Sequence, residues 1–246
     1  MAGAQTTANN TQEGVPGVIQ QLLPASVVVV ETFEDVTGEA VFPGEEDLVA
    51  QAVESRRREF VTTRRCARQA LAKLGYAPAA IRRGPKREPL WPTGIVGSMT
   101  HTSNFRAAAI AYRSVLASIG IDAEPNEPLP GGVEDRVLTP SEQDMLIALR
   151  RKLPRLHWGR LLFSAKESIY KAWYPLTGRW LGFDDARVTI DPKGTFSAKL
   201  LVDGARTDGG PDLTEISGRF VSHRDLVLTA VAVSHDHQTS RTAARG

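Results

Sequence analysis

The sequence predicts an α+β fold in which one chain forms two similar halves. Three observations lead to this prediction. A β-branched strand pattern over 27–33 precedes a long helical pattern over 46–74, a second helical pattern covers 161–173, and strand patterns follow each helix. One long helix with a few strands in each half is typical of two α/β units that lie side by side.

We expect the first half to span residues 15–118 and the second half to span residues 119–237. The segments 1–14 and 238–246 are polar and small, which indicates two disordered tails. Because both halves lie in one chain, no second chain is needed to combine them. We therefore expect a monomer.

The composition indicates a soluble globular protein of the cytoplasm. Of the 246 residues, 41% are hydrophobic and 24% are charged, and a net charge of +2 argues against a nucleic-acid-binding polyelectrolyte. No apolar run is long enough to span a membrane, and no signal-peptide core follows the N-terminus. The single cysteine, Cys66, excludes an internal disulfide and fits a reducing compartment.

The first half begins with a short helix over 18–23 and the strand over 27–33. The helix predicted over 46–74 ends at Gly75, a residue common at helix C-termini. Most arginines of this helix are expected in solvent, but one or two of them are suited to hold a phosphate by forked hydrogen bonds. These arginines are Arg56, Arg57, Arg58, Arg64, Arg65 and Arg68.

Two adjoining segments add anion-binding groups. The segment 81–92 is rich in Pro and Gly, which predicts a loop. A short apolar strand then runs from Gly94 into a predicted Gly-Ser-Met-Thr-His turn, whose hydroxyls and imidazole can donate hydrogen bonds to an anion. A lone histidine is more often a packed or surface residue, and only its neighbours make this one a candidate. The candidate residues are Arg83, Lys86, Ser98, Thr100 and His101.

The strand patterns over 105–111 and 115–121 predict a hairpin joined at 112–114. This pairing would bring the turn at His101 close to the end of the second strand. There Asp122 and Glu124 are two residues apart, so their side chains project from one face.

The rest of the second half is predicted to contain two helices and two hairpins. Thr139, Pro140 and Glu142 form a helix-start signature, which predicts a helix over 140–151. The helix over 161–173 has an apolar stripe of Leu162, Ala165, Ile169 and Trp173. The hairpins are expected over 187–201, with a turn at 192–194, and over 215–233, with a turn at 222–225.

Acidic residues of the second half suggest a metal site. Glu167 and Lys171 are four apart on the predicted helix and lie together on its surface. If that surface meets the strand, the carboxylates of Asp122, Glu124 and Glu167 surround one point together with one ammonium group. Three oxygen donors without histidine or thiolate suit Mg²⁺ rather than Zn²⁺. Taken separately, each pair is also typical of a solvated surface.

Several motifs occur together in a specific order. They are R-R-R-E-F-V-T-T-R-R-C-A-R, R-G-P-K-R-E-P-L-W-P, G-S-M-T-H, G-I-D-A-E-P and F-S-A-K-E-S-I-Y-K-A-W. With them, the chain from about residue 42 to 180 resembles the large, pseudo-dimeric 4′-phosphopantetheinyl transferases associated with surfactin and enterobactin synthases, above all their actinobacterial branch. The resemblance implies the fold of that family, with pseudo-twofold symmetry between the halves.

The resemblance also implies an activity and roles for residues. Enzymes of this family move the phosphopantetheine arm of coenzyme A onto a serine of an apo acyl, peptidyl or aryl carrier protein and leave adenosine 3′,5′-bisphosphate. By the matching positions, Mg²⁺ would be held by Asp122, Glu124 and Glu167. Lys171 would contact the pyrophosphate, and Glu167 would accept the proton of the serine. The 3′-phosphate and adenine end would meet Arg56, Arg64, Ser98, Thr100 and His101, with Arg83 and Lys86 nearby.

Two other functions compete with this reading. A Mg²⁺-dependent nucleotide or coenzyme A pyrophosphohydrolase would use the same acids and cations, and it would need no carrier protein. A non-enzymatic anion-binding module would use the arginine helix to dock RNA or an acidic partner. An aromatic content of only 7%, without a recognisable RNA-binding motif, argues against the module.

Overall fold

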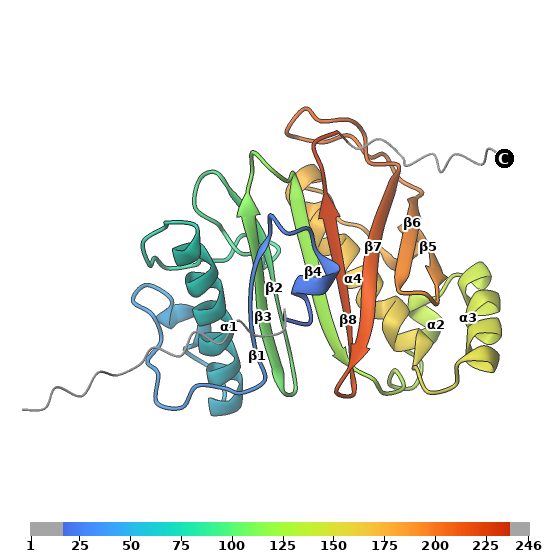
Figure 1. Cartoon of the computed structure of the whole chain (residues 1–246), viewed down its shortest axis with the longest axis horizontal. Coiled ribbons are helices and arrows are strands. Elements are labelled where there is room, and N and C mark those ends of the chain that lie inside the picture. Colours follow the sequence, from blue (N-terminus) through green and yellow to red (C-terminus); the bar gives the residue numbers. More distant parts are fainter. Residues whose placement is uncertain (1–16, 237–246) are drawn as a thin grey trace, which may run out of the picture.

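The computed structural model of the chain describes residues 17–236. Two antiparallel sheets lie side by side, and each carries one helix of 20 residues (Figure 1). One sheet has the strand order β1-β3-β2 and the other the order β4-β8-β7-β6-β5. The predicted α+β class, with two helix–sheet halves in one chain, is therefore confirmed. The two tails predicted to be disordered lie outside the described residues.

In the first half, helix α1 packs against β1 and β3. The elements of this half are η1 (Gln20–Leu22), β1 (Val28–Thr32), η2 (Glu46–Val49), α1 (Glu54–Lys73), β2 (Ile95–Thr102) and β3 (Phe105–Tyr112).

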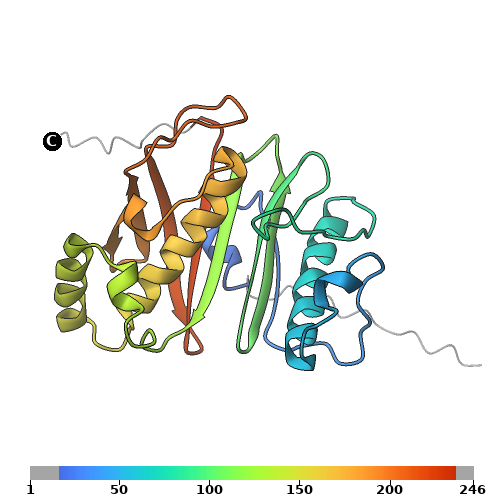
Figure 2. The same ribbon diagram turned by 180° about the vertical axis from the view of Figure 1, so that it is seen from behind.

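In the second half, helix α4 lies across β4 and β8, as the view from behind shows (Figure 2). The elements are β4 (Ser118–Pro125), α2 (Glu134–Val137), α3 (Pro140–Lys152), α4 (Trp158–Thr177), η3 (Phe183–Asp185), β5 (Ala186–Asp191), β6 (Thr195–Leu200), β7 (Glu215–His223) and β8 (Leu226–Val233). Both hairpins predicted in this half are confirmed.

The prediction of one helix over 46–74 was wrong at its beginning. A 3₁₀ turn covers 46–49, the chain then leaves the helical conformation, and α1 begins only at Glu54. The break lies at Val53, whose extended backbone interrupts the helical conformation and precedes α1. The fully buried Glu45 anchors the start of the 3₁₀ turn, because its Oε1 accepts hydrogen bonds from Nη1 of Arg68 at 2.8 Å and from the amide of Ile81 at 2.7 Å.

The predicted hairpin over 105–111 and 115–121 was also wrong. Strand β3 pairs with β1 on one side and with β2 on the other, whereas β4 pairs with β8. The physical reason is that β3 is buried on both faces from Phe105 to Ala111, so it takes the central place in its sheet and has no free edge for β4. The hairpin of this region is β2–β3.

The Gly-Ser-Met-Thr-His segment is likewise a strand and not a turn. It belongs to β2, which continues to Thr102, and its partners on β3 run from Ile110 back to Arg106. Alternate side chains of this segment therefore point to opposite faces of the sheet.

Two hydroxyl groups join the two sheets where β2 runs beside β4. Oγ of Ser98 accepts a hydrogen bond from the amide of Ile121, and Oγ1 of Thr100 accepts one from the amide of Ala123, both at 3.1 Å. Between β2 and β4, these side-chain hydrogen bonds take the place of backbone-to-backbone pairing. This junction brings the predicted anion-binding strand next to the predicted metal-binding strand.

Helix α4 sits unusually close to β4. A Cβ atom on Gly120 would lie 1.9 Å from the carbonyl oxygen of Ser168, so only glycine permits this approach. The predicted apolar stripe of the helix is confirmed, because Leu162, Ala165, Ile169 and Trp173 are all fully buried in the core of the second half. None of the helices within residues 17–236 is long and apolar enough to cross a membrane.

Candidate functional site

A cleft with a volume of about 1180 Å³ contains charged groups from both halves. Its size suits an extended organic ligand of several rings or phosphates. Eight of the residues predicted from the sequence line it: Arg56, Arg64, Arg83, Lys86, Ser98, His101, Glu167 and Lys171. Thr100, Asp122 and Glu124 do not line it.

Helix α1 contributes one continuous face to the cleft. Arg56, Phe60, Thr63 and Arg64 occupy positions i, i+4, i+7 and i+8, which fall on one side of a helix. The other arginines of the helix do not line the cleft. Arg57 and Arg68 lie seven residues before and four after Arg64, so the helical period alone does not separate the two groups. The packing of α1 decides which arginines reach the cleft.

Arg64 is buried and held rigidly. Its Nε donates to the carbonyl oxygen of Ile81 at 3.2 Å and lies 3.8 Å from Oε2 of Glu45, while the guanidinium packs 3.7 Å from the centre of the Phe60 ring. Burial above all lowers the pKa of Arg64 to about 10, so the group stays charged at neutral pH. A fixed, partly desolvated cation of this kind suits an anionic ligand.

Repulsion between cations adds to this preference. The neighbouring Arg83 and Arg56 both act to lower the pKa of Arg64. Burial, followed by Arg87 and Arg56, lowers the pKa of Arg83 as well. A bound polyanion would relieve this repulsion.

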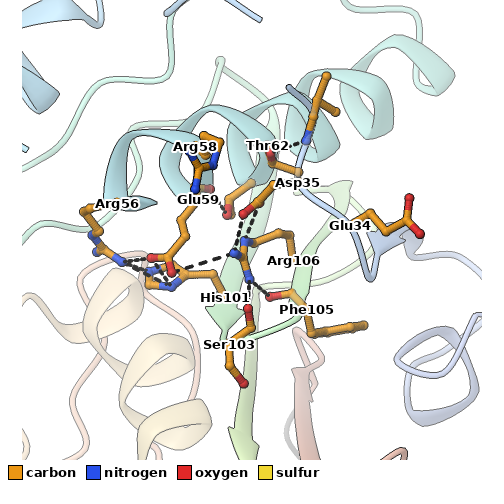
Figure 3. A network of polar contacts seen from close by, with 12 residues as sticks. Glu34, Asp35, Arg56, Arg58, Glu59, Thr62, His101, Ser103, Phe105 and Arg106 are labelled. Carbon is orange, nitrogen blue, oxygen red and sulfur yellow. Dashed lines mark hydrogen bonds and ion pairs between the residues drawn. The ribbon is translucent and has the colours of Figure 1, made fainter. Parts of the chain in front are cut away.

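His101 lies directly against Arg56. Nη1 of Arg56 is 2.8 Å from Nε2 and 3.2 Å from Nδ1 of the imidazole, and Figure 3 shows the two side chains facing each other. Burial, and then the charge of Arg56, lower the pKa of His101 to about 4. The ring is thus neutral at pH 7 and accepts a hydrogen bond from the guanidinium.

Asp122 is the centre of a second group of polar side chains. Its Oδ1 accepts a hydrogen bond from Nζ of Lys171 at 2.7 Å, and its Oδ2 accepts one from Oγ of Ser164 at 2.8 Å. Thr100 donates a longer one, 3.4 Å, to Oδ1. The Lys171 face of α4 therefore meets the Asp122 strand, which was the condition for the metal site suggested from the sequence.

The other two acids have raised pKa values. Burial, and then the charge of Asp122, raise the pKa of Glu124 to about 7, even though Nη1 of Arg160 donates to its Oε2 at 3.0 Å. The same two causes raise the pKa of Glu167. No hydrogen bond or ion pair joins the Glu167 carboxylate to another residue within 17–236. Carboxylates that burial and mutual repulsion disfavour are groups that a divalent cation would stabilise.

The donor set therefore fits Mg²⁺ in its chemistry, since all three groups are carboxylates. Across residues 17–236, no three His, Cys, Asp or Glu side chains already converge as a ligand set. Lys171 occupies Oδ1 of Asp122 and Arg160 occupies Oε2 of Glu124. Binding of an ion would require these two cations to share or release their carboxylates.

Comparison with known proteins identifies the family. The chain is 48% identical to the 4′-phosphopantetheinyl transferase Svp of Streptomyces mobaraensis, over 93% of this chain and 94% of that protein. It is 45% identical to the 4′-phosphopantetheinyl transferase PptT of Mycobacterium tuberculosis, over 88% of this chain and 98% of that protein. The chain belongs to the 4′-phosphopantetheinyl transferase superfamily.

Further matches agree with this membership of the transferase superfamily. The model of the 4′-phosphopantetheinyl transferase N-terminal domain matches residues 44–111, and that of the 4′-phosphopantetheinyl transferase superfamily matches residues 118–226. Enterobactin synthase component D of Salmonella typhimurium is 32% identical over 77% of this chain and 79% of that protein. The family and the enzyme class predicted from the motifs are confirmed.

Sequence reasoning missed several residues that contact the predicted ones in this candidate site. Ser164 lies seven residues before Lys171, a spacing that places both on one helix face, so periodicity was a usable signal. Glu59, three residues after Arg56, offered a similar signal. Arg160 lies seven residues before Glu167 and so had the same signal, but it falls just outside the helix predicted over 161–173.

Proposed function

We propose that this transferase moves the 4′-phosphopantetheine arm of coenzyme A onto a serine of an apo acyl, peptidyl or aryl carrier protein. The observation that supports this proposal most is that one cleft contains two separate groups of charged side chains. Mutually repelling arginines line it, and so does a lysine paired with a carboxylate. Coenzyme A carries phosphate at two separated places, the 3′-position and the pyrophosphate, and therefore matches both groups.

The 3′-phosphate and adenine end are assigned to the cations of the first half. Arg56, Arg64 and His101 receive the 3′-phosphate, because they share the cleft wall formed by α1 and β2. Arg83 and Lys86 lie on the neighbouring loop of the same cleft and add positive charge. Ser98 and Thr100 accept hydrogen bonds from β4, so we assign them to the junction that holds the two charged groups together.

The pyrophosphate is assigned to the second half. Asp122, Glu124 and Glu167 would hold Mg²⁺, which would neutralise charge on the pyrophosphate oxygens when bound. Lys171 lies beside Asp122 and lines the cleft, which suits an ammonium that contacts the same phosphates. Its charge stabilises the leaving phosphate as the anhydride breaks.

The reaction forms one bond and breaks one. The hydroxyl oxygen of the carrier serine attacks the phosphorus that bears the pantetheine arm, and the bond from this phosphorus to the bridging oxygen breaks. Adenosine 3′,5′-bisphosphate leaves with that oxygen and its electron pair. Glu167 accepts the serine proton directly or through a water molecule. Its raised pKa suits this role, because a more basic carboxylate is a better proton acceptor.

The proposed setting is the cytoplasm, where coenzyme A and apo carrier proteins meet. The protein acts there as a monomer, since one chain supplies both walls of the cleft. Neither a membrane nor a nucleic acid takes part.

The decisive experiment is intact-protein mass spectrometry of an apo carrier protein incubated with this protein, coenzyme A and Mg²⁺. The expected result is a gain of one phosphopantetheine mass. The gain in mass should disappear with EDTA and return with excess Mg²⁺. The rate at which the carrier is modified should fall at least about 100-fold in Glu167→Ala. Asp144→Ala, which removes an exposed acid on α3, is the matched control and should leave the rate unchanged.

The competing functions give different results. Consumption of coenzyme A without any modified carrier, across acyl, peptidyl and aryl types, would favour a pyrophosphohydrolase. Carrier modification that persists unchanged in EDTA would contradict the metal assignment alone.

A further inference from the structure

Glu59 lies between the proposed 3′-phosphate site and a buried arginine. It stands on α1, three residues after Arg56, and its side chain reaches down toward the sheet (Figure 3). One carboxylate oxygen, Oε2, accepts a hydrogen bond from Nη1 of Arg56 at 3.0 Å and lies 3.7 Å from Nδ1 of His101. The other, Oε1, lies 3.7 Å from Nη2 of Arg106.

Arg106 is a fixed anchor for this arrangement. Its side chain is only 4% exposed and forms a two-pronged ion pair with Asp35, at 2.9 and 2.8 Å. Nη1 donates to the carbonyl oxygens of Thr102, Ser103 and Phe105, which close the β2–β3 turn. A guanidinium held by so many partners cannot follow a moving ligand, so it supplies a stationary positive charge beside Glu59.

Arg56, in contrast, needs restraint. Its side chain is 47% exposed, and a free arginine side chain loses much rotamer freedom when it binds a phosphate. Glu59 fixes the guanidinium before any ligand arrives and keeps it in contact with the imidazole of His101. Restraint of this kind lowers the entropic cost of binding.

A carboxylate so near a phosphate site also repels the ligand. Arg106 offsets this effect, because it shares the charge of Glu59 from the side away from Arg56. Asp35 then balances Arg106 in turn. The chain Asp35–Arg106–Glu59–Arg56 thus alternates in sign and ends in the cation that faces the cleft.

We propose that Glu59 is a positioning residue, which holds Arg56 and His101 in the geometry that recognises the 3′-phosphate of coenzyme A. This inference rests on the proposed function, since it assumes that the 3′-phosphate binds at these two side chains. It adds a specificity role: Glu59 should govern how strongly the enzyme prefers ligands with a 3′-phosphate over ligands without one.

The test compares ligands that differ only in this phosphate. Transfer rates with coenzyme A and with 3′-dephospho-coenzyme A are measured for the wild type, Glu59→Ala and Glu59→Gln. Loss of a charge-assisted contact should lower the preference for coenzyme A about 10–100-fold in Glu59→Ala, through KM and with kcat nearly unchanged. Glu59→Gln, which can still accept a hydrogen bond from Arg56, should recover part of the preference.

Glu54→Gln is the matched control. Glu54 lies on the same helix and is paired with Arg58 at 3.6 Å, but its side chain is 71% exposed. It should keep the full preference for coenzyme A. Equal losses on both substrates in Glu59→Ala would overturn the proposal, since they would show a purely structural role. An unchanged or stronger preference for coenzyme A would overturn it as well.

A binding measurement separates this inference from the proposed reaction. Calorimetry compares adenosine 3′,5′-bisphosphate with 5′-AMP and needs no catalysis. One outcome is that transfer fails while the wild type still binds adenosine 3′,5′-bisphosphate more tightly than 5′-AMP. If Glu59→Ala then removes this difference in affinity, the positioning role of Glu59 stands without the proposed reaction. If the wild type binds both nucleotides equally, the role of Glu59 is refuted whatever the transfer assay gives. Circular dichroism of each variant confirms that it is folded.

Discussion

Nζ of Lys171 lies 2.7 Å from Oδ1 of Asp122 and 3.0 Å from the carbonyl oxygen of Ile121. A side chain of helix α4 is thereby bound to both the backbone and a carboxylate of strand β4. The same contact places an ammonium group at the wall of the cleft. One ammonium group thus takes part both in a contact between helix and strand and in the wall of the cleft.

Replacing Lys171 should damage the rate far more than the fold. Lys171→Ala is expected to lower kcat about 10²–10³-fold, because the leaving phosphate loses a charged partner. Asp122 retains its hydrogen bond from Ser164, so we expect a cooperative unfolding transition. Carrier modification followed by mass spectrometry and thermal unfolding by circular dichroism check both points. Lys199→Ala, an exposed lysine of β6, should change neither. Loss of the unfolding transition in Lys171→Ala would contradict the prediction.

A methyl group on Gly120 should push α4 away from β4. Its Cβ would lie 1.9 Å from the carbonyl oxygen of Ser168, so Gly120→Ala should reduce the free energy of unfolding by about 1–3 kcal/mol or more. Glu167 and Lys171 lie on the displaced helix, and activity should fall with stability. At Gly131 no atom lies within 4 Å of the added group, and Gly131→Ala serves as the control. Urea unfolding of both variants gives the comparison, and equal stability would refute the close packing.

His101 should make stability depend on pH between about 6.5 and 4. The folded protein has a His101 pKa of about 4, below the value near 6.5 expected of the unfolded chain. Within this window the unfolded chain binds more protons, so the free energy of unfolding falls as the pH is lowered. His101→Gln removes this contribution, and the stability of the wild type relative to the variant should therefore decrease from pH 7 to pH 4. Urea unfolding at four pH values tests this. A difference that is constant with pH would show that His101 titrates normally.

Truncation of the α4 core stripe should affect stability before activity. Ile169 is fully buried in the core of the second half, and Ile169→Ala should cost about 2–5 kcal/mol. Trp173, on the same stripe, should behave in the same way. Leu153→Ala removes an aliphatic group that is 46% exposed and should cost no more than about 0.5 kcal/mol. Chemical denaturation measures all three, and transfer rates per folded molecule should stay within a few-fold of the wild type.

Local signals in the sequence predicted much of the second half correctly. The helix start at Thr139 is where its motif indicated, and Oε2 of Glu142 accepts a hydrogen bond from the amide of Thr139 at 2.7 Å. The turn of the β5–β6 hairpin contains Gly194 with a φ of 105°, a conformation that glycine readily adopts. These features arise from contacts between residues a few positions apart, so the pattern and its cause lie in the same short segment.

The start of α1 is a feature that local sequence signals did not predict. Between residues 46 and 54 no Gly or Pro marks a break, and a continuous helix was a reasonable expectation. The break lies at the extended Val53, and the turn before it is anchored by the buried carboxylate of Glu45, which bonds to Arg68 and to the amide of Ile81. Neither partner can be recognised from the residues around Glu45.

In the candidate site, too, some contacts follow from local patterns and others do not. Helical and strand periods paired Glu167 with Lys171 and Asp122 with Glu124, whereas the choice of Arg56 and Arg64 came from the family resemblance. Periodicity said nothing of the pairing of Arg106 with Asp35, 71 residues apart in the chain, or of Glu59 as the link to the cleft. The first contact depends on the pairing of β1 with β3, and the second depends on the packing of α1 on β3.

Side-chain spacing and ordered motifs were thus enough for the fold class, the family and eight of the residues that line the cleft, because each depends on short-range patterns. Only the tertiary structure decided which strand lies beside β4 and which cation each acid meets. The hydroxyls of Ser98 and Thr100 bond to amides 23 residues later. Any strand offers such amides, so nothing in the local sequence distinguishes the partner that folding selects.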